Sequence, residues 1–192
     1  MKNFILILSI IIFKSSTLIG QENISLGAKG GINLSNMSSD YFADSNFRTG
    51  FHLGLFAEIP LGERFSFQPE LLYGTQGAKA DRKMDGSGPR TTEYKLDYLQ
   101  IPVLAKIFLT ESLSIEAGPS FNFLVNEKTD GQETDFGRNF EFAGALGASY
   151  KFGYNFFGNL RYTYGFTSAF NKEFSDNSER NNGFQLGVGF AF

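Results

Sequence analysis

Residues 51–73 read FHLGLFAEIPLGERFSFQPELLY and contain the pattern that decides the fold. Apolar residues alternate with polar or small residues on both sides of the short segment Pro60–Glu63. A period of two places successive side chains on opposite faces of a strand, whereas a helical face needs a period near 3.6. The stretch therefore predicts two antiparallel strands, 51–59 and 65–73, joined by a tight turn.

The same alternation recurs along the rest of the chain. Six further segments show it, with apolar faces running over Ile24–Leu34, Tyr94–Ile107, Leu113–Phe123, Phe140–Tyr150, Phe156–Phe166 and Phe184–Phe192. After residue 20, no window keeps a helical period for three turns. Each segment is long enough to cross a bilayer as a tilted strand. We therefore predict an all-β chain with eight antiparallel strands in up-and-down order.

One of these segments changes phase. Its apolar set passes from Tyr94, Leu96 and Tyr98 to the odd-numbered residues from Leu99 onward. One extra residue in a β-bulge would restore the alternation, and a proline nearby (Pro102) fits such an irregularity. We predict a bulge near Tyr98–Gln100.

The connections between segments alternate strictly in length. The short ones are Pro60–Glu63, Phe108–Ser112 and Lys151–Asn155, and the long polar ones are Ser35–Thr49, Thr75–Thr92, Val125–Asn139 and Thr167–Gly183. Short periplasmic turns and long outer loops are typical of outer-membrane barrels. The pattern predicts an integral outer-membrane protein with both termini on the periplasmic side.

Alternation alone does not say which face points inward, because a soluble eight-stranded barrel buries its apolar face instead. Glycines crowd the polar face, and aromatic residues gather near the strand ends of the apolar face. A narrow polar lumen and interfacial aromatic girdles both favour the membrane barrel. The hypothesis places a polar network in the lumen, made of Lys29, His52, Glu58, Gln68, Glu70, Glu116, Asn122, Glu141, Arg161 and Gln185.

The first twenty residues differ from the rest. Lys2 precedes the apolar run Phe4–Phe13, which is too short to span a bilayer as a helix. This layout predicts a secretory signal peptide over residues 1–20, cleaved between Gly20 and Gln21, with an uncleaved anchor as the alternative. Residues 21–192 then form the barrel domain.

Composition excludes several functions. The 192 residues contain no Cys, which rules out thiol catalysis, disulfides and cysteine metal sites. The formal net charge is -3, so we expect no nucleic-acid partner. We expect no cofactor and no metal ion, and an acidic loop over 125–139 is interpreted as solvated. The single histidine, His52, has no recognisable nucleophile motif beside it.

The last strand ends in phenylalanine and presents apolar residues at every second position. Its members are Phe184, Leu186, Val188, Phe190 and Phe192. This ending resembles the signal that the bacterial barrel assembly machinery recognises. We therefore expect that machinery to be a partner during biogenesis.

The chain also resembles the small outer-membrane β-barrel family of Bacteroidetes, called PorT-like or "porin family". The matching stretches are GAKGGINLS (27–35), FHLGLFAEIPLGERFSFQPELLY (51–73), LDYLQIPVLAKI (96–107), AGPSFNFL (117–124) and FQLGVGFAF (184–192). The resemblance implies an eight-stranded outer-membrane barrel and says little about activity. Some PorT relatives take part in type IX protein secretion.

These observations predict a structural or interaction protein that acts through four long outer loops. Its expected partners are outer-membrane lipid and lipopolysaccharide, with an envelope or secretion protein as a further candidate. Eight strands leave an interior that side chains fill, so salt-bridged carboxylates are expected to plug the lumen. A narrow channel for ions or small solutes is the alternative. An accessory secretion barrel and a membrane enzyme near His52 remain further alternatives.

Overall fold

The computed structural model describes residues 24–38, 45–84, 87–134, 137–169 and 180–192. The predicted signal peptide, with its cleavage site at Gly20 and Gln21, lies outside the described residues. The described part contains the strands β1 (Ser25–Ser38), β2 (Ser45–Pro60), β3 (Phe65–Met84), β4 (Ser87–Phe108), β5 (Leu113–Thr129), β6 (Gln132–Glu133), β7 (Phe140–Phe152), β8 (Phe156–Gly165) and β9 (Arg180–Ala191).

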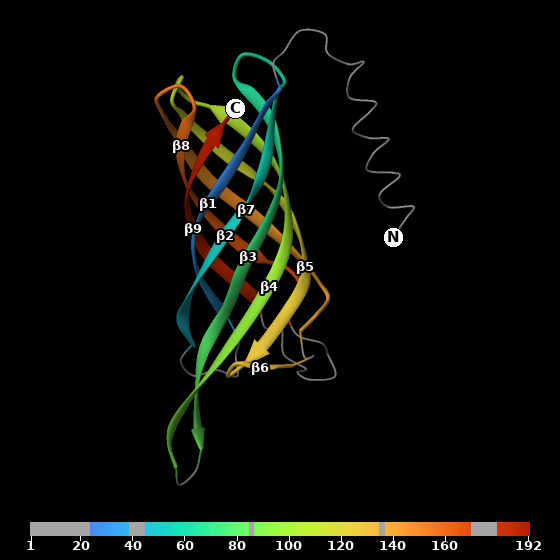
Figure 1. Cartoon of the computed structure of the whole chain (residues 1–192), viewed down its shortest axis with the longest axis vertical. Helices are drawn as coiled ribbons and strands as arrows, with labels where there is room; N and C mark the ends of the chain where they lie inside the picture. Colours follow the sequence, from blue (N-terminus) through green and yellow to red (C-terminus); the bar gives the residue numbers. More distant parts are fainter. Residues whose placement is uncertain (1–23, 39–44, 85–86, 135–136, 170–179) are drawn as a thin grey trace, which may run out of the picture.

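The sheet closes on itself. Every neighbouring pair is antiparallel, and β1 pairs with β9 from Gly27 opposite Ala191 to Ser38 opposite Arg180. The two-residue β6 only extends the end of β5, so eight strands make the barrel wall (Figure 1). A closed barrel satisfies every backbone group of the wall without an open edge. The predicted eight-stranded up-and-down barrel is confirmed. Among the described residues, no helix has the length and apolar character needed to cross a membrane.

Polar side chains fill the inside and apolar side chains cover the outside. Leu53 and Val188 are each 62% exposed, whereas Arg161 and Glu141 are each 1% exposed. Aromatic residues near the strand ends, such as Phe65, also point outward and are exposed. A soluble protein has the opposite arrangement, with apolar side chains inside, so the alternative of a soluble barrel with an apolar cavity is excluded. It matches an outer surface that meets lipid.

The predicted bulge near Tyr98–Gln100 is wrong. In β4 all the even-numbered residues from Tyr94 to Lys106 point inward, and the β3–β4 register is continuous from Leu72 opposite Gln100 to Arg82 opposite Arg90. The irregularity lies in the neighbouring strand β5, where Val125 is the extra residue between Asp97 opposite Asn126 and Tyr98 opposite Leu124. The hydropathy pattern misled because Tyr94, Leu96 and Tyr98, although apolar, lie on the inner face of β4.

The long connections are shorter than expected because the strands continue into them. The predicted loop Thr75–Thr92 is mostly a hairpin, since β3 runs to Met84 and β4 begins at Ser87. This β3–β4 hairpin projects beyond the other strands at the end opposite the C-terminus (Figure 1). The first long connection also shortens, because β1 ends at Ser38 and β2 begins at Ser45. We call the projecting side the long-loop end and the other side the short-turn end.

Candidate functional site in the barrel lumen

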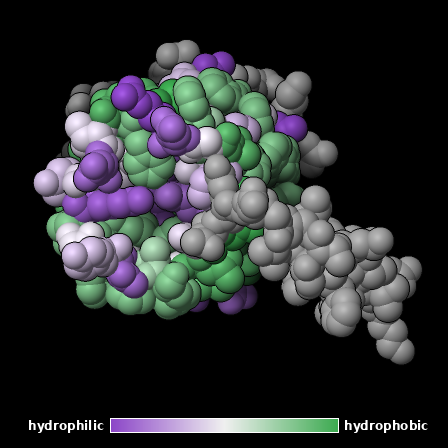
Figure 2. Space-filling view, turned by 90° about the horizontal axis from the view of Figure 1, so that it is seen from above, coloured by the Kyte–Doolittle hydropathy of each residue, from purple (hydrophilic) through white to green (hydrophobic). Residues whose placement is uncertain are grey.

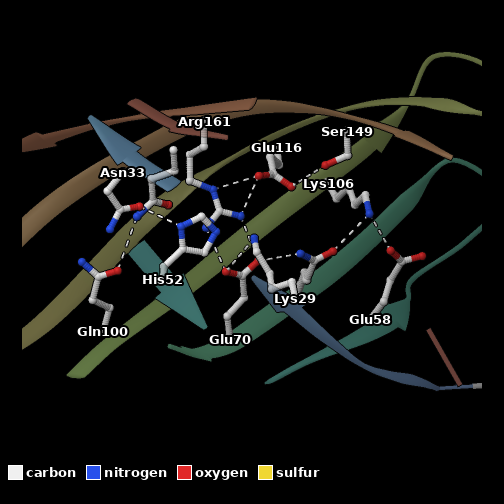
Figure 3. Close-up of polar contacts among 12 residues, drawn as sticks. Lys29, Asn33, His52, Glu58, Glu70, Gln100, Lys106, Glu116, Ser149 and Arg161 are labelled. Carbon is white, nitrogen blue, oxygen red and sulfur yellow. Dashed lines mark hydrogen bonds and ion pairs between the residues drawn. The ribbon is translucent and has the colours of Figure 1, made fainter. Parts of the chain in front are cut away.

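A group of four charged side chains crosses the middle of the lumen, and we call it the central charge cluster. It consists of Lys29 from β1, Glu70 from β3, Glu116 from β5 and Arg161 from β8 (Figure 3). The guanidinium of Arg161 donates to both oxygens of Glu70 at 2.8 Å and to Oε1 of Glu116 at 2.6 and 2.9 Å. The ammonium of Lys29 donates to Glu70 at 3.2 and 3.3 Å. Arg161 thus links three strands of the barrel, β3, β5 and β8.

The central charge cluster is electrically balanced. Its two cations face two carboxylates, and all four side chains are at most 2% exposed. Buried charges are tolerated when they are paired and hydrogen-bonded. Neighbouring polar groups complete the bonding, since Gln68 donates to Glu70 at 2.7 Å and Ser149 donates to Glu116 at 3.1 Å. The cluster fills the lumen and leaves its carboxylates paired.

A second barrier lies toward the short-turn end. Lys106 donates to Glu58 at 2.6 Å and to Gln68 at 3.1 Å. The rings of Phe56 and Phe157 meet edge to face across the lumen, with centroids 5.3 Å apart. Glycine makes room for them, because a Cβ on Gly27 would lie 2.3 Å from the Phe56 ring. A Cβ on Gly189 of β9 would likewise lie 2.3 Å from the Phe157 ring, so the aromatic pair closes the lumen where β1 and β9 carry glycine.

Outside this barrier the short-turn end is hollowed. A cavity of about 530 Å³ is lined by residues of the short turns and of the wall, among them Glu58, Arg64, Phe108 and Lys151. Seen from this end, hydrophilic residues cross the middle and hydrophobic residues surround them (Figure 2). The hollow is a vestibule, and its lining includes Glu58, the carboxylate that Lys106 binds.

Amide and carboxylate side chains occupy the lumen on the other side of the central charge cluster. Nδ1 of His52 lies 2.7 Å from Oδ1 of Asn33, and Nε2 of His52 has no hydrogen-bond partner among the described residues. Glu141 accepts from Nδ2 of Asn122 at 3.1 Å and from the hydroxyl of Tyr98 at 3.4 Å. No serine, threonine or carboxylate is hydrogen-bonded to His52 in the described part of the chain.

An apolar cluster closes the lumen at the long-loop end. It contains Met37, Ala78, Tyr94, Leu96, Tyr98 and Ala169, all at most 9% exposed, with Leu124 packed against them. Ala169 follows β8, and its carbonyl accepts from the amide of Arg138 at 2.7 Å. The chain after β8 and the chain before β7 thus meet over the apolar cluster. This cover was not predicted from the sequence.

The structure places all ten residues of the predicted polar network on the inner side of the wall. It brings Lys29, Glu70, Glu116 and Arg161 into one cluster with Gln68, and it brings Glu141 against Asn122. Glu58 lies apart at the short-turn end, and His52 bonds Asn33. Gln185 donates to Gln100 at a long 3.4 Å.

Several lumen residues were missed by the sequence reasoning. They are Asn33, Gln100, Ser149 and Asn159, all of them buried and polar. Strand parity is the signal that would have found Asn33, Ser149 and Asn159, since each lies an even number of residues from a predicted lumen residue on the same strand. Gln100 lies on β4, to which the predicted network assigns no residue. The residues of the predicted C-terminal assembly signal lie on the outer face; Phe184, Leu186, Val188 and Phe192 are 45–74% exposed.

Several solved structures of bacterial outer-membrane proteins have a similar fold. Neisserial surface protein A (NspA) shows 18% identity, with 89% of this chain and 100% of that chain covered and a TM-score of 0.60. Ail, the attachment invasion locus protein of Yersinia pestis, in complex with sucrose octasulfate, shows 14% identity at 89% and 100% coverage and a TM-score of 0.55. OprG of Pseudomonas aeruginosa shows 13% identity at 90% and 98% coverage and a TM-score of 0.51. At these identities the likeness shows the fold alone.

A comparison with curated proteins gave no match. The family model described as "Outer membrane protein beta-barrel domain" matches residues 18–171, which is most of the chain. The closed antiparallel barrel, its apolar outer surface and this match agree on an integral outer-membrane location. The chain belongs to the outer membrane protein beta-barrel domain family.

Proposed function

We propose that this protein is a closed outer-membrane barrel that acts as a structural or interaction protein through its long-loop end. The observation that carries the proposal is the filling of the lumen. Beside the central charge cluster, the cavity in the middle of the barrel has a volume of only about 10 Å³. Such a space holds about one water molecule. Ion pairs, the Phe56–Phe157 pair and the apolar cluster lie along the remaining path.

The long-loop end offers the surface for a partner. The β3–β4 hairpin projects farthest there, and its sequence from 79 to 90 contains four basic and two acidic residues (Figure 1). Lipopolysaccharide phosphates are anions that basic side chains recognise. We infer that lipopolysaccharide is the first partner of this hairpin, and that an envelope or secretion protein is a candidate for the other loops.

Orientation and biogenesis complete the proposal. The short turns, the start of β1 and the end of β9 lie at the same end of the barrel, which supports a periplasmic location for both termini. The outward row ending in Phe192 supports recognition by the barrel assembly machinery. The resemblance to the PorT-like barrels of Bacteroidetes supports an accessory role in secretion as a narrower version of the same function. We propose no catalytic role, because His52 is bound to Asn33 and buried.

Single-channel recording tests the proposal. The mature chain is refolded, its folding is checked by the heat-dependent shift on a gel, and it is inserted into a planar bilayer. The expected result is a folded barrel without open steps. Reproducible open steps would refute the closed lumen and make passage of ions or small solutes the leading function. A His52→Ala variant should keep any activity that is discovered, and a complete loss would favour the enzyme alternative.

The loop surface is tested separately. Binding of the folded barrel to vesicles containing lipopolysaccharide is compared before and after replacing Lys79, Arg82, Lys83 and Arg90 by serine. Weaker binding that also falls with salt would support the hairpin as the contact. Unchanged binding would move the interaction surface to another loop.

A further inference from the structure

Arg180 is a basic residue on the outer wall of the barrel, at the long-loop end. It begins β9 and lies opposite Ser38 of β1. The next residue, Asn181, is buried in the lumen, whereas Phe184, four residues after Arg180, is 45% exposed on the outer face. Because successive side chains of a strand point to opposite faces, Arg180 lies on the same outer face as Phe184.

A tyrosine on the neighbouring strand β8 holds the guanidinium of Arg180 in place. Nη1 of Arg180 donates to the hydroxyl of Tyr164 at 3.0 Å, and the central carbon of the guanidinium lies 6.0 Å from the centroid of the Tyr164 ring. The Tyr164 ring packs against the ring of Phe166, with centroids 5.7 Å apart. A cation beside an aromatic face is attracted by the ring, so these contacts fix the guanidinium at the level of Tyr164.

This level corresponds to the lipid headgroups. On β9 the outward apolar residues end at Phe184, whose ring packs against Tyr162 with centroids 5.0 Å apart, and the next outward residue is Asn182. Tyr164 lies opposite Asn182, two residues beyond the Tyr162–Phe184 pair. Two residues of a strand tilted by about 40° advance about 5 Å along the barrel axis. The headgroup layer on each side of a bilayer is about 5–7 Å thick, so the guanidinium lies within it.

The charge of Arg180 is not neutralised by the described part of the chain. No carboxylate of the described residues lies within 4.0 Å of its guanidinium, whereas Lys95, another outward cation, lies 3.5 Å from Asp97. The outward residues at the next level, Asn182 and Asn36, are neutral. A guanidinium has five N–H donors, and the bond to Tyr164 uses one of them. The remaining donors suit a phosphate, which a guanidinium binds with two parallel hydrogen bonds.

We propose that Arg180 binds the phosphate of a lipopolysaccharide headgroup, with Tyr164 as the residue that positions the guanidinium. The acyl chains of the same lipid lie on the apolar surface below, which includes Leu34, Tyr162 and Phe184, all 37–45% exposed. The choice of lipopolysaccharide rests on the proposed outward location of the long-loop end. The strand order places β8 and β9 across the barrel from β3 and β4, so this site is separate from the β3–β4 hairpin.

Titration of the folded, detergent-solubilised barrel with diphosphoryl lipid A tests the proposal, with native mass spectrometry counting the bound lipid. The natural protein should bind this lipid more tightly than lipid A from which the phosphates have been removed. Arg180→Met should weaken binding of diphosphoryl lipid A about tenfold, since a hydrogen bond to a charged group contributes about that factor. Arg180→Lys keeps the charge without the planar fork, and Tyr164→Phe keeps the ring without the hydroxyl, so both should show intermediate losses.

Arg64→Met is the matched control, because Arg64 is an exposed arginine at the short-turn end and its removal changes the net charge equally. The proposal is overturned if Arg180→Met binds lipid A as tightly as the natural protein, or if Arg64→Met loses as much affinity. It is also overturned if inorganic phosphate displaces the lipid, since the site would then hold a free anion. Folding of each variant is checked by the heat-dependent gel shift, and if Arg180→Met fails to fold, Arg180→Lys and Tyr164→Phe decide.

The same titration separates this site from the proposed hairpin contact. The variant with Lys79, Arg82, Lys83 and Arg90 replaced by serine is measured beside Arg180→Met. Weaker binding of Arg180→Met alone would support the Arg180 site and refute the hairpin contact. Weaker binding of the hairpin variant alone would refute the Arg180 site and leave the proposed function in place.

Discussion

Removing the guanidinium of Arg161 should destabilise the barrel far more than removing both it and one of its carboxylates. The change is Arg161→Met, which keeps an unbranched side chain of similar length. Four hydrogen bonds to Glu70 and Glu116 are lost. Lys29 still neutralises Glu70, but Glu116 keeps only the hydroxyl of Ser149. Leaving one buried charge without a partner costs about 3–5 kcal/mol.

The charge-balanced double variant, Arg161→Met with Glu116→Gln, gives the sharper comparison. Replacing a buried pair by groups of similar volume is often close to neutral, so the double variant should be more stable than Arg161→Met alone. Equilibrium urea unfolding in lipid vesicles, followed by far-ultraviolet circular dichroism, measures each free energy. Lys151→Met is the control, since Lys151 is 40% exposed, its partner Glu58 keeps Lys106 at 2.6 Å, and stability should change by at most about 1 kcal/mol. If the double variant were no more stable than Arg161→Met, charge compensation would not be the reason for the cluster.

Three further predictions concern the wall. Leu53→Arg, on the outer face, should cost about 2–4 kcal/mol of stability in vesicles if it lies near the bilayer midplane, whereas Leu61→Arg in a short turn should be tolerated; urea midpoints compare them. Gly27→Ala places a Cβ 2.3 Å from the Phe56 ring and 2.5 Å from the Phe190 carbonyl oxygen, so the free energy of unfolding should fall by about 1–3 kcal/mol. In the control Gly158→Ala, the new Cβ meets only the Phe152 ring at 3.3 Å and the Gly187 oxygen at 3.8 Å, so stability should change little. Phe192→Ala should slow membrane insertion in cells without lowering the urea midpoint of the refolded protein. A normal insertion rate would contradict the prediction that the C-terminal strand is an assembly signal.

The strands of the barrel wall and the direction of their side chains could be predicted from the sequence, because lipid outside and a narrow lumen inside impose a strict alternation on each strand. Leu53 and His52 illustrate it, since adjacent residues differ from 62% to 1% exposed. The rule failed where the inner surface stopped being polar. Tyr94, Leu96 and Tyr98 point inward into the apolar cluster, so hydropathy no longer reported the face. The projecting hairpin was missed for a related reason, because polar strand residues beyond the membrane look like a loop.

The sequence did not predict which lumen carboxylates pair with Arg161. Parity places Glu70, Glu116 and Glu141 on the inner face alike, but only the depth of each along the tilted wall decides which one meets Arg161. That depth depends on register, and Val125 shifts the register of β4 against β5 by one residue. A period-two pattern carries no information on such a shift until both strands are placed. The pairing of Arg161 with Glu70, 91 residues away, therefore needed the structure.

The connectivity of the central charge cluster also bears on how the barrel is assembled. Glu70 and Glu116 belong to the third and fifth strands, whereas their shared cation arrives only with β8, 45 residues after Glu116. A chain that has inserted only its first strands would present Glu70 and Glu116 to the membrane interior with Lys29 as the only cation of the central charge cluster. Partly inserted intermediates are thus penalised until the last hairpin docks on β1. Insertion and closure should for this reason occur as one concerted event, and a folding time course should show a single kinetic phase.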